Sequence, residues 1–157
     1  MHHTSLEPRL AEALLALSCA VEQIRATVSR SLGLTPQQAQ LLGLVAERGF
    51  THGELAGRLD CDKTNITGLV NRLERRELIK RRPDPNDRRA SRVFLSDQGA
   101  QLVSELRTGL TAAIADRMSS CPPTHRDQLA TLAHSTTEAL RSSPRLDSSR
   151  ELSAPEQ

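Results

Sequence analysis

The sequence predicts a mainly α-helical fold with one β-hairpin, in the order four helices, hairpin, two helices. Three observations support this order. Apolar residues repeat at helical spacing near both ends of the chain. Ser, Thr or Asp stands directly before several of these repeats, as expected at helix starts. Between residues 79 and 95, prolines and an alternating apolar pattern replace the helical spacing.

The first predicted helix begins near Thr4, which can form a capping box with Glu7. Apolar residues then recur in alternating steps of four and three. This heptad pattern is too short for an independent coiled coil, so we expect it to pack against a partner helix. Its members are Leu10, Leu14, Leu17, Val21, Ile24 and Val28.

Capping signals place the next three helices. Thr35 precedes Pro36 and predicts the start of a second helix, which we expect Gly49 to end. Thr51 and Glu54 predict a short third helix. After a tight turn at residues 60–62, a fourth helix follows, whose buried face is expected to contain Ile66, Leu69, Val70 and Leu73. Two short helices joined by a few residues are a helix-turn-helix candidate.

The segment after the fourth helix predicts a two-stranded hairpin with a long tip. Pro83 and Pro85 exclude a helix, and residues 92–95 alternate as in a strand. Ser96 can cap a long fifth helix, and Cys121-Pro122-Pro123-Thr124 separates it from a sixth.

The outer face of the predicted fourth helix is short and polar. Thr, Asn and Gly are poor helix formers, so exposure to solvent alone does not explain them. A helix of this kind fits the major groove of DNA, where Asn, Thr and Arg can contact base edges or phosphates. With Asp62 as N-cap, the side chains expected to face the groove are Lys63, Thr64, Asn65, Thr67, Gly68, Asn71 and Arg72.

Positive charge is concentrated around the predicted hairpin. Nine arginines and lysines stand against four acids in residues 72–92, whereas the whole chain has a formal net charge of +2. This cluster favours an acidic partner. At the tip, we expect Arg89 to enter a DNA minor groove, with Asp87 holding its guanidinium in one orientation. Phosphate contacts are expected from Arg81, Arg82 and Arg88.

Composition limits the remaining function classes. The chain has 157 residues, 37% hydrophobic and 25% charged, which is ordinary for one globular domain. It has no apolar run that could span a membrane and no secretory signal pattern, so we expect a cytoplasmic protein. Neither the histidines nor the three widely spaced cysteines suggest a metal site, and no catalytic motif is present, so no cofactor and no enzyme activity are expected.

The sequence resembles the multiple-antibiotic-resistance regulator (MarR) family of winged helix-turn-helix transcription factors. The resemblance depends on LTPQQAQLLGLV, on ELAGRLDCDKTNITGLVNRLERRELIKRR and, most specifically, on DPNDRRASRVFLSDQG. In the last of these, Asp87 and Arg89 occupy the Asp-x-Arg of the family's wing. Two positions depart from the family pattern: Glu77 replaces the usual Gly after the recognition helix, and Ser96 replaces a Thr, which preserves capping.

The resemblance implies a homodimer in which the first, fifth and sixth helices interlock. Such a dimer presents two DNA-binding units to a pseudo-palindromic operator on double-stranded DNA. The family usually represses transcription, and a small-molecule effector usually binds near the first, second and fifth helices. Dimer contacts are expected from Leu10, Leu14, Leu17, Val21, Leu110, Ile114 and Leu132.

The predicted organisation has four parts. Residues 1–31 form an N-terminal dimerisation helix and residues 32–99 the winged helix-turn-helix. Residues 100–141 form the C-terminal dimerisation helices, and residues 142–157, rich in Ser, Pro and charge, form a mobile tail.

Two alternative functions remain open at the level of sequence. One is a DNA-binding redox sensor that uses the thiol of Cys19, Cys61 or Cys121. The other is a protein-interaction module that binds an acidic protein without specific DNA binding.

Overall fold

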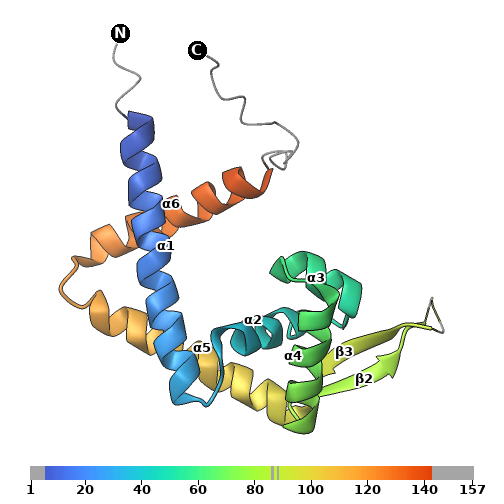
Figure 1. Ribbon diagram of the computed structural model, residues 1–157. Coiled ribbons are helices and arrows are strands. Elements are labelled where there is room, and N and C mark those ends of the chain that lie inside the picture. The colour runs from blue at the N-terminus through green and yellow to red at the C-terminus, as the bar shows by residue number, and fades with distance from the viewer. Residues whose placement is uncertain (1–5, 86, 88, 143–157) are drawn as a thin grey trace, which may run out of the picture. The chain divides into compact units, whose positions relative to one another are not determined.

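The computed structural model describes residues 6–85, 87 and 89–142 (Figure 1). The described chain is mainly helical, with one small antiparallel sheet, which confirms the predicted fold class. It forms two compact units that divide between Asp116 and Arg117. The elements are α1 (Leu6–Ser31), α2 (Pro36–Val45), β1 (Phe50–Thr51), α3 (His52–Leu59), α4 (Lys63–Arg75), β2 (Ile79–Pro83), β3 (Ser91–Leu95), α5 (Asp97–Arg117) and α6 (Pro123–Ser142).

The predicted capping boxes of α2 and α3 are both present. The Thr35 hydroxyl accepts a hydrogen bond from the backbone N–H of Gln38 at 3.2 Å, and the Gln38 side chain accepts one from Thr35 N–H at 3.0 Å. Thr51 and Glu54 make the same reciprocal pair at 3.2 and 2.8 Å. These bonds satisfy N–H groups that have no partner inside the helix.

Gly49 does not end the second helix, contrary to the prediction. Helix α2 ends at Val45 and has Ala46 as its C-cap. Gly49 is buried instead against the ring of Phe94, where a β-carbon would lie 2.3 Å from two ring carbons. Contact with an aromatic ring, rather than helix termination, therefore requires glycine here.

The predicted hairpin belongs to a three-stranded sheet, so the expectation of two strands was incomplete. The strand order is β1-β3-β2, with both pairs antiparallel. Val93 in the central strand pairs with Phe50 on one side and Arg81 on the other. The strand β1 has two residues, too few to produce a recognisable alternation in the sequence. Figure 1 shows β2 and β3 projecting beyond α4 as the wing.

The core lies between α2, α3, α4, the sheet and the first half of α5. All four apolar residues predicted for the inner face of α4 are buried, as are Val103 and Leu106 of α5. The largest fully buried side chains are Phe50, Leu41, Leu42, Leu55, Ile66, Leu73 and Leu78. This packing fixes α4 and the base of the wing relative to one another.

The helix α4 ends in a Schellman motif. The Leu78 N–H donates to the Leu73 carbonyl at 3.0 Å, and the Glu77 N–H donates to the Glu74 carbonyl at 2.8 Å. Glu77 has φ = 57°, in the left-handed region that favours glycine. The glutamate at the position where the resemblance expects glycine therefore keeps the turn but adopts a strained backbone.

The start of α5 is capped as predicted. The Ser96 hydroxyl accepts a hydrogen bond from Gly99 N–H at 2.9 Å and donates to the Glu77 carbonyl at 2.5 Å. Ser96 therefore joins the helix start to the turn after α4.

Several predictions fall at the edges of the described chain. Thr4, the predicted first cap, and residues 143–157 of the predicted tail lie outside the described residues, and Ser142 is the last residue of α6. In the second compact unit, α6 has no buried residue. Among the described residues, no helix is long and apolar enough to cross a membrane.

Candidate DNA-binding surface

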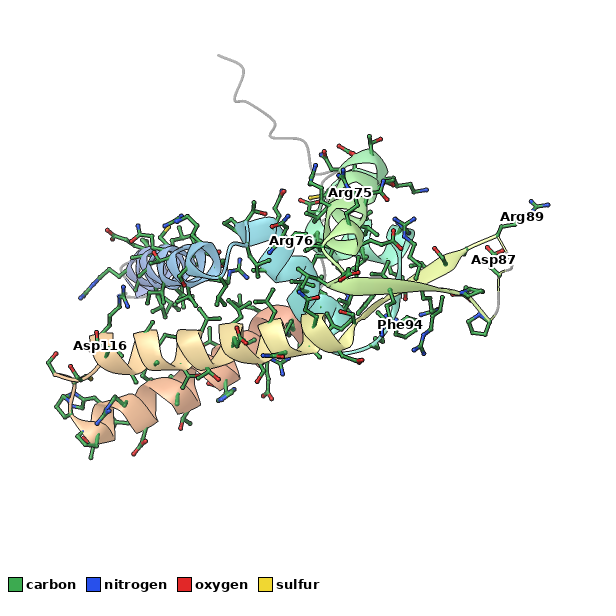
Figure 2. The ribbon with its side chains drawn as sticks, turned by 90° about the horizontal axis from the view of Figure 1, so that it is seen from below. Arg75, Arg76, Asp87, Arg89, Phe94 and Asp116 are labelled. Atoms are coloured by element: carbon green, nitrogen blue, oxygen red, sulfur yellow. The ribbon has the colours of Figure 1, made fainter. Side chains whose placement is uncertain are left out.

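The outer face of α4 collects the polar residues predicted to contact the major groove. Asp62 caps the helix, because its carboxylate accepts from the Asn65 N–H at 2.7 Å. Six of the seven predicted residues are exposed, and Gly68 is half-buried: Lys63, Thr64, Asn65, Thr67, Gly68, Asn71 and Arg72. Arg75 is exposed on the same face and projects from α4 in Figure 2. The sequence-based site omitted Arg75, although its helical spacing from Gly68 and Asn71 could have identified it.

Several of these side chains have their polar atoms oriented by neighbours. The Asn65 amide nitrogen donates to the Asp62 carboxylate at 2.9 Å, and the Thr67 hydroxyl donates to the Lys63 carbonyl at 2.8 Å. At Gly68, an added β-carbon would meet no described atom closer than the Arg72 guanidinium, at 3.7 Å. Packing within the protein therefore does not require glycine at position 68.

The arginines of the wing differ in their intramolecular contacts. Arg81 donates to the Asn71 side-chain oxygen, and its guanidinium lies 3.0 Å from the Glu74 carboxylate. The Arg82 guanidinium lies 5.2 Å from the centre of the Phe94 ring. Arg81 is thus already paired within the protein, and a phosphate contact would compete with that pair.

The tip of the wing places Arg89 far from the core. In Figure 2, Arg89 and Asp87 lie at the far end of the two strands. Asp87 does not contact the Arg89 guanidinium as expected; its carboxylate accepts from the Arg89 backbone N–H at 2.9 Å. The acid therefore shapes the turn, as Asp commonly does two residues before an N–H. Arg88 lies outside the described residues.

Intramolecular contacts separate the arginines of the basic cluster into two groups. Arg76 donates to the Gly33 carbonyl at 2.9 Å and joins the end of α4 to the turn before α2. Within the described residues, no ion pair is formed by Arg72, Arg75 or Arg89. The guanidinium groups of these three arginines therefore have no described carboxylate partner that an external anion would need to displace.

Arg92 and Asp84 form a second structural contact that sequence reasoning missed. The Arg92 Nε donates to the Asp84 carboxylate at 2.6 Å, and its Nη1 donates to the Gly49 carbonyl at 3.1 Å. The same guanidinium lies 3.6 Å from the Glu54 carboxylate of α3. Asp84 is 6% exposed, so this pair is sheltered from water. Arg92 therefore attaches the end of the strands nearest the tip of the wing to α3.

Glu54 is held in its charged form by several donors. The Thr51 backbone N–H has the largest effect and, with the Arg48 guanidinium at 2.9 Å, lowers the pKa of Glu54 from 4.5 to about 2. Next to it, burial and the nearby Arg81 lower the pKa of His52 below its ordinary value of 6.5, although Glu74 opposes this. A neutral His52 adds no charge to this surface near neutral pH.

A polar groove of about 530 Å³ lies between the start of α3 and the wing. Its lining includes His52, Arg89 and Arg92 as well as the acids Asp84 and Asp87. Within the described ranges, no three His, Cys, Asp or Glu side chains lie close enough to hold a metal ion together. The groove thus runs from the start of α3 to the tip of the wing.

A second groove, of about 390 Å³, lies beside the end of α1 and the start of α5, and Leu32, Leu78, Gln101 and Leu102 contribute to its lining.

The three cysteines are free thiols in different environments. Cys19 is exposed on α1, whereas Cys61 and Cys121 are half-buried. The Cys61 thiol donates to the Leu59 carbonyl at 3.2 Å and packs against the core.

The predicted dimerisation residues expose apolar surface. On α1, Leu10 is 57% exposed, and Leu17 and Val21 are also exposed. Leu14 and Leu110 are half-buried. Ile114 on α5 is exposed, and in the second unit Leu132 on α6 is 63% exposed. Each helix therefore presents apolar side chains that its own unit leaves uncovered.

Comparison with known proteins gives a consistent result. The MarR family profile matches residues 32–90. TtmR, an HTH-type transcriptional regulator of Methylorubrum extorquens (strain PA1), is 31% identical over 146 residues, which cover 84% of this chain and 73% of TtmR.

Solved structures share the fold. A MepR variant from S. aureus, bound to an oligodeoxyribonucleotide, matches with a TM-score of 0.61 and 21% identity over 83% of this chain and 97% of MepR. CouR from Rhodococcus jostii RHA1, bound to p-coumaroyl-CoA, matches with a TM-score of 0.70 and 22% identity over 92% of this chain and 99% of CouR. With its helix-turn-helix, its wing and these relatives, the chain belongs to the MarR family of DNA-binding transcription regulators and is not an enzyme.

Proposed function

We propose that this regulator acts as a homodimer that binds a pseudo-palindromic operator and represses transcription until a small molecule releases it. In each subunit, the outer face of α4 enters a major groove and Arg89 enters the adjacent minor groove. One observation carries the proposal: α4 buries four apolar residues and leaves the opposite face to short polar and basic side chains. A helix with such a face fits the major groove.

The wing supports the minor-groove contact. Arg89 is exposed at the tip and has no ion pair among the described residues. The Asp87 carboxylate accepts a hydrogen bond from the Arg89 backbone N–H, which supports the position of Arg89 at the tip. A narrow minor groove has strong negative potential and attracts arginine.

The exposed apolar residues of α1, α5 and α6 support the homodimer. Leu10 and Leu17 in the first unit, and Leu132 in the second, are large apolar side chains that are costly to leave in water. A Leu17→Glu variant is expected to be monomeric in analytical ultracentrifugation, whereas the wild-type protein sediments as a dimer at micromolar concentration. A monomeric wild-type protein would contradict the proposal.

A solved relative suggests what kind of small molecule could act as the effector. CouR was solved with p-coumaroyl-CoA, an acyl thioester with an aromatic group. In this chain, the groove of about 390 Å³ beside the end of α1 and the start of α5 is the candidate site for a small molecule. The test is to search for a compound that releases the protein from its operator. If the groove is the effector site, that compound should also protect the backbone amides of the groove residues from hydrogen exchange.

The deciding experiment is selection of bound fragments from randomised duplexes, followed by competition. The selected duplex should outcompete random DNA by at least about a thousandfold. If no duplex does so, binding of an acidic protein partner becomes the better explanation. The Arg89→Ala variant should bind the selected duplex more weakly than the wild type by about 1–3 kcal/mol. Arg30→Ala, which removes an equal charge from the end of α1, serves as the matched control.

A further inference from the structure

The side-chain amide of Asn71 is oriented by the wing. Asn71 lies on the exposed face of α4, opposite the buried Leu69 and Leu73. Its side-chain oxygen accepts a hydrogen bond from the Arg81 guanidinium of β2. The Arg81 guanidinium also forms an ion pair with the Glu74 carboxylate at 3.0 Å. Glu74 lies about one helical turn after Asn71 in α4. The amide is therefore oriented before any DNA is bound.

The chemistry of the guanidinium fixes which end of the amide points outward. A guanidinium has only donors, so the Asn71 atom that faces Arg81 must be the oxygen and not the nitrogen. The amide nitrogen, with its two hydrogens, then lies on the side away from Arg81. The second lone pair of the oxygen remains, but a DNA donor approaching it would come beside a positively charged group. Asn71 and Arg81 together thus offer donors to a ligand.

An amide that turns its donor nitrogen outward interacts differently with adenine and with guanine. Asparagine recognises adenine by donating to N7 while accepting from the N6 amino group, which requires an accessible amide oxygen. Guanine presents two acceptors, N7 and O6, on the same edge. We propose that Asn71, oriented by Arg81, acts as a hydrogen-bond donor that selects guanine over adenine at one base pair of the operator. This inference rests on the proposed function.

Asn65 provides an internal contrast. Its amide nitrogen faces the Asp62 carboxylate at 2.9 Å, which can only accept. The amide oxygen of Asn65 therefore points away from its intramolecular partner, the reverse of Asn71. The two asparagines of α4 differ in the group they offer to DNA, although they are the same residue type.

The test compares base preferences at every operator position for four proteins: the wild type, Asn71→Ala, Arg81→Met and Arg82→Met. Arg82 is the matched control, because it lies on the same strand and carries the same charge but contacts the Phe94 ring. Loss of preference in Asn71→Ala identifies the base pair that Asn71 contacts. There, the wild type should prefer guanine over adenine by about tenfold, the size of one good base contact.

Arg81→Met should reduce this ratio to about one or reverse it, whereas Arg82→Met should lower the affinity for all sequences and keep the ratio. Replacing the selected guanine by 7-deazaguanine, which lacks the N7 acceptor, should weaken the wild type and leave Asn71→Ala unaffected. Circular dichroism and unfolding of each variant verify that the fold is retained.

Three results would overturn the inference: identical preferences of the wild type and Asn71→Ala, a wild-type preference for adenine at that base pair, or an unchanged guanine preference in Arg81→Met. If the wild type preferred no duplex over random DNA, the proposed function would fail first, and this inference with it. The two failures are therefore distinguishable.

Discussion

The backbone of Gly99, at the start of α5, lies directly against the backbone of Leu78, at the start of the wing. A β-carbon on residue 99 would stand 1.9 Å from the Leu78 carbonyl oxygen, well inside the contact distance of the two atoms. The same carbonyl accepts a hydrogen bond from Ser96 N–H at 3.1 Å, so it cannot move without losing a partner. The wing and α5 are thus joined through backbone atoms.

Gly99→Ala is therefore expected to destabilise the protein. Overpacking against a backbone group costs roughly 1–3 kcal/mol, or more where neighbours cannot shift. Urea unfolding monitored by circular dichroism measures the change. Gly57→Ala is the control, because Gly57 is exposed in α3 and an added β-carbon would meet no described atom within 4 Å. That variant should gain about 0.5–1 kcal/mol from improved helix propensity. Equal effects of the two substitutions would contradict the close approach.

Glu77→Gly is expected to stabilise the protein. The left-handed backbone of Glu77 costs a residue with a β-carbon about 1–2 kcal/mol, and glycine avoids this cost. Part of the gain is offset by the greater flexibility of glycine in the unfolded chain, so a net gain of about 0.5–1 kcal/mol is expected. Glu47→Gly, at an exposed glutamate outside the left-handed region, should instead destabilise the protein. A loss of stability in Glu77→Gly would show that its side chain has a role that the backbone strain does not reveal.

Gly68→Ala is expected to change stability and DNA affinity in opposite directions. Space exists for the methyl group, so the helix should gain about 0.5–1 kcal/mol. If α4 lies in the major groove, the methyl group occupies the position of close approach and operator affinity falls. Unfolding experiments and fluorescence anisotropy with the selected duplex measure the two effects. Unchanged affinity would place Gly68 outside the contact surface.

Stability should fall on acidification in a window set by Glu54. Its pKa is about 2 in the folded protein and 4.5 without these partners, so folding favours the charged form. The contribution is therefore fully present above pH 4.5 and is lost as the pH falls towards 2. Glu54→Gln should flatten the pH dependence of unfolding in this window. Parallel pH profiles of wild type and Glu54→Gln would refute the assignment.

Features set by short stretches of sequence could be predicted. The caps at Thr35, Thr51, Asp62 and Ser96 involve residues three positions apart, so their geometry follows from local chemistry. The buried and exposed faces of α4 follow from the helical period in the same way. The family motif added the wing and its arginine.

Features that depend on distant residues could not be predicted. The strand β1 exists because Phe50 pairs with Val93, and Gly49 faces Phe94 for the same reason. The count of basic residues did not distinguish Arg81, which has partners within the protein, from Arg89, which projects from the tip. Only the three-dimensional arrangement shows which charges are already neutralised.

The bond network of Arg92 has a mechanical consequence. One guanidinium holds Asp84 of the wing, the Gly49 carbonyl and, more loosely, Glu54 of α3. A tilt of α3 would therefore be passed through Arg92 to the part of the wing that carries Arg89. If Arg89 lies in a minor groove as proposed, such a tilt would withdraw it from the DNA while the described elements stay folded.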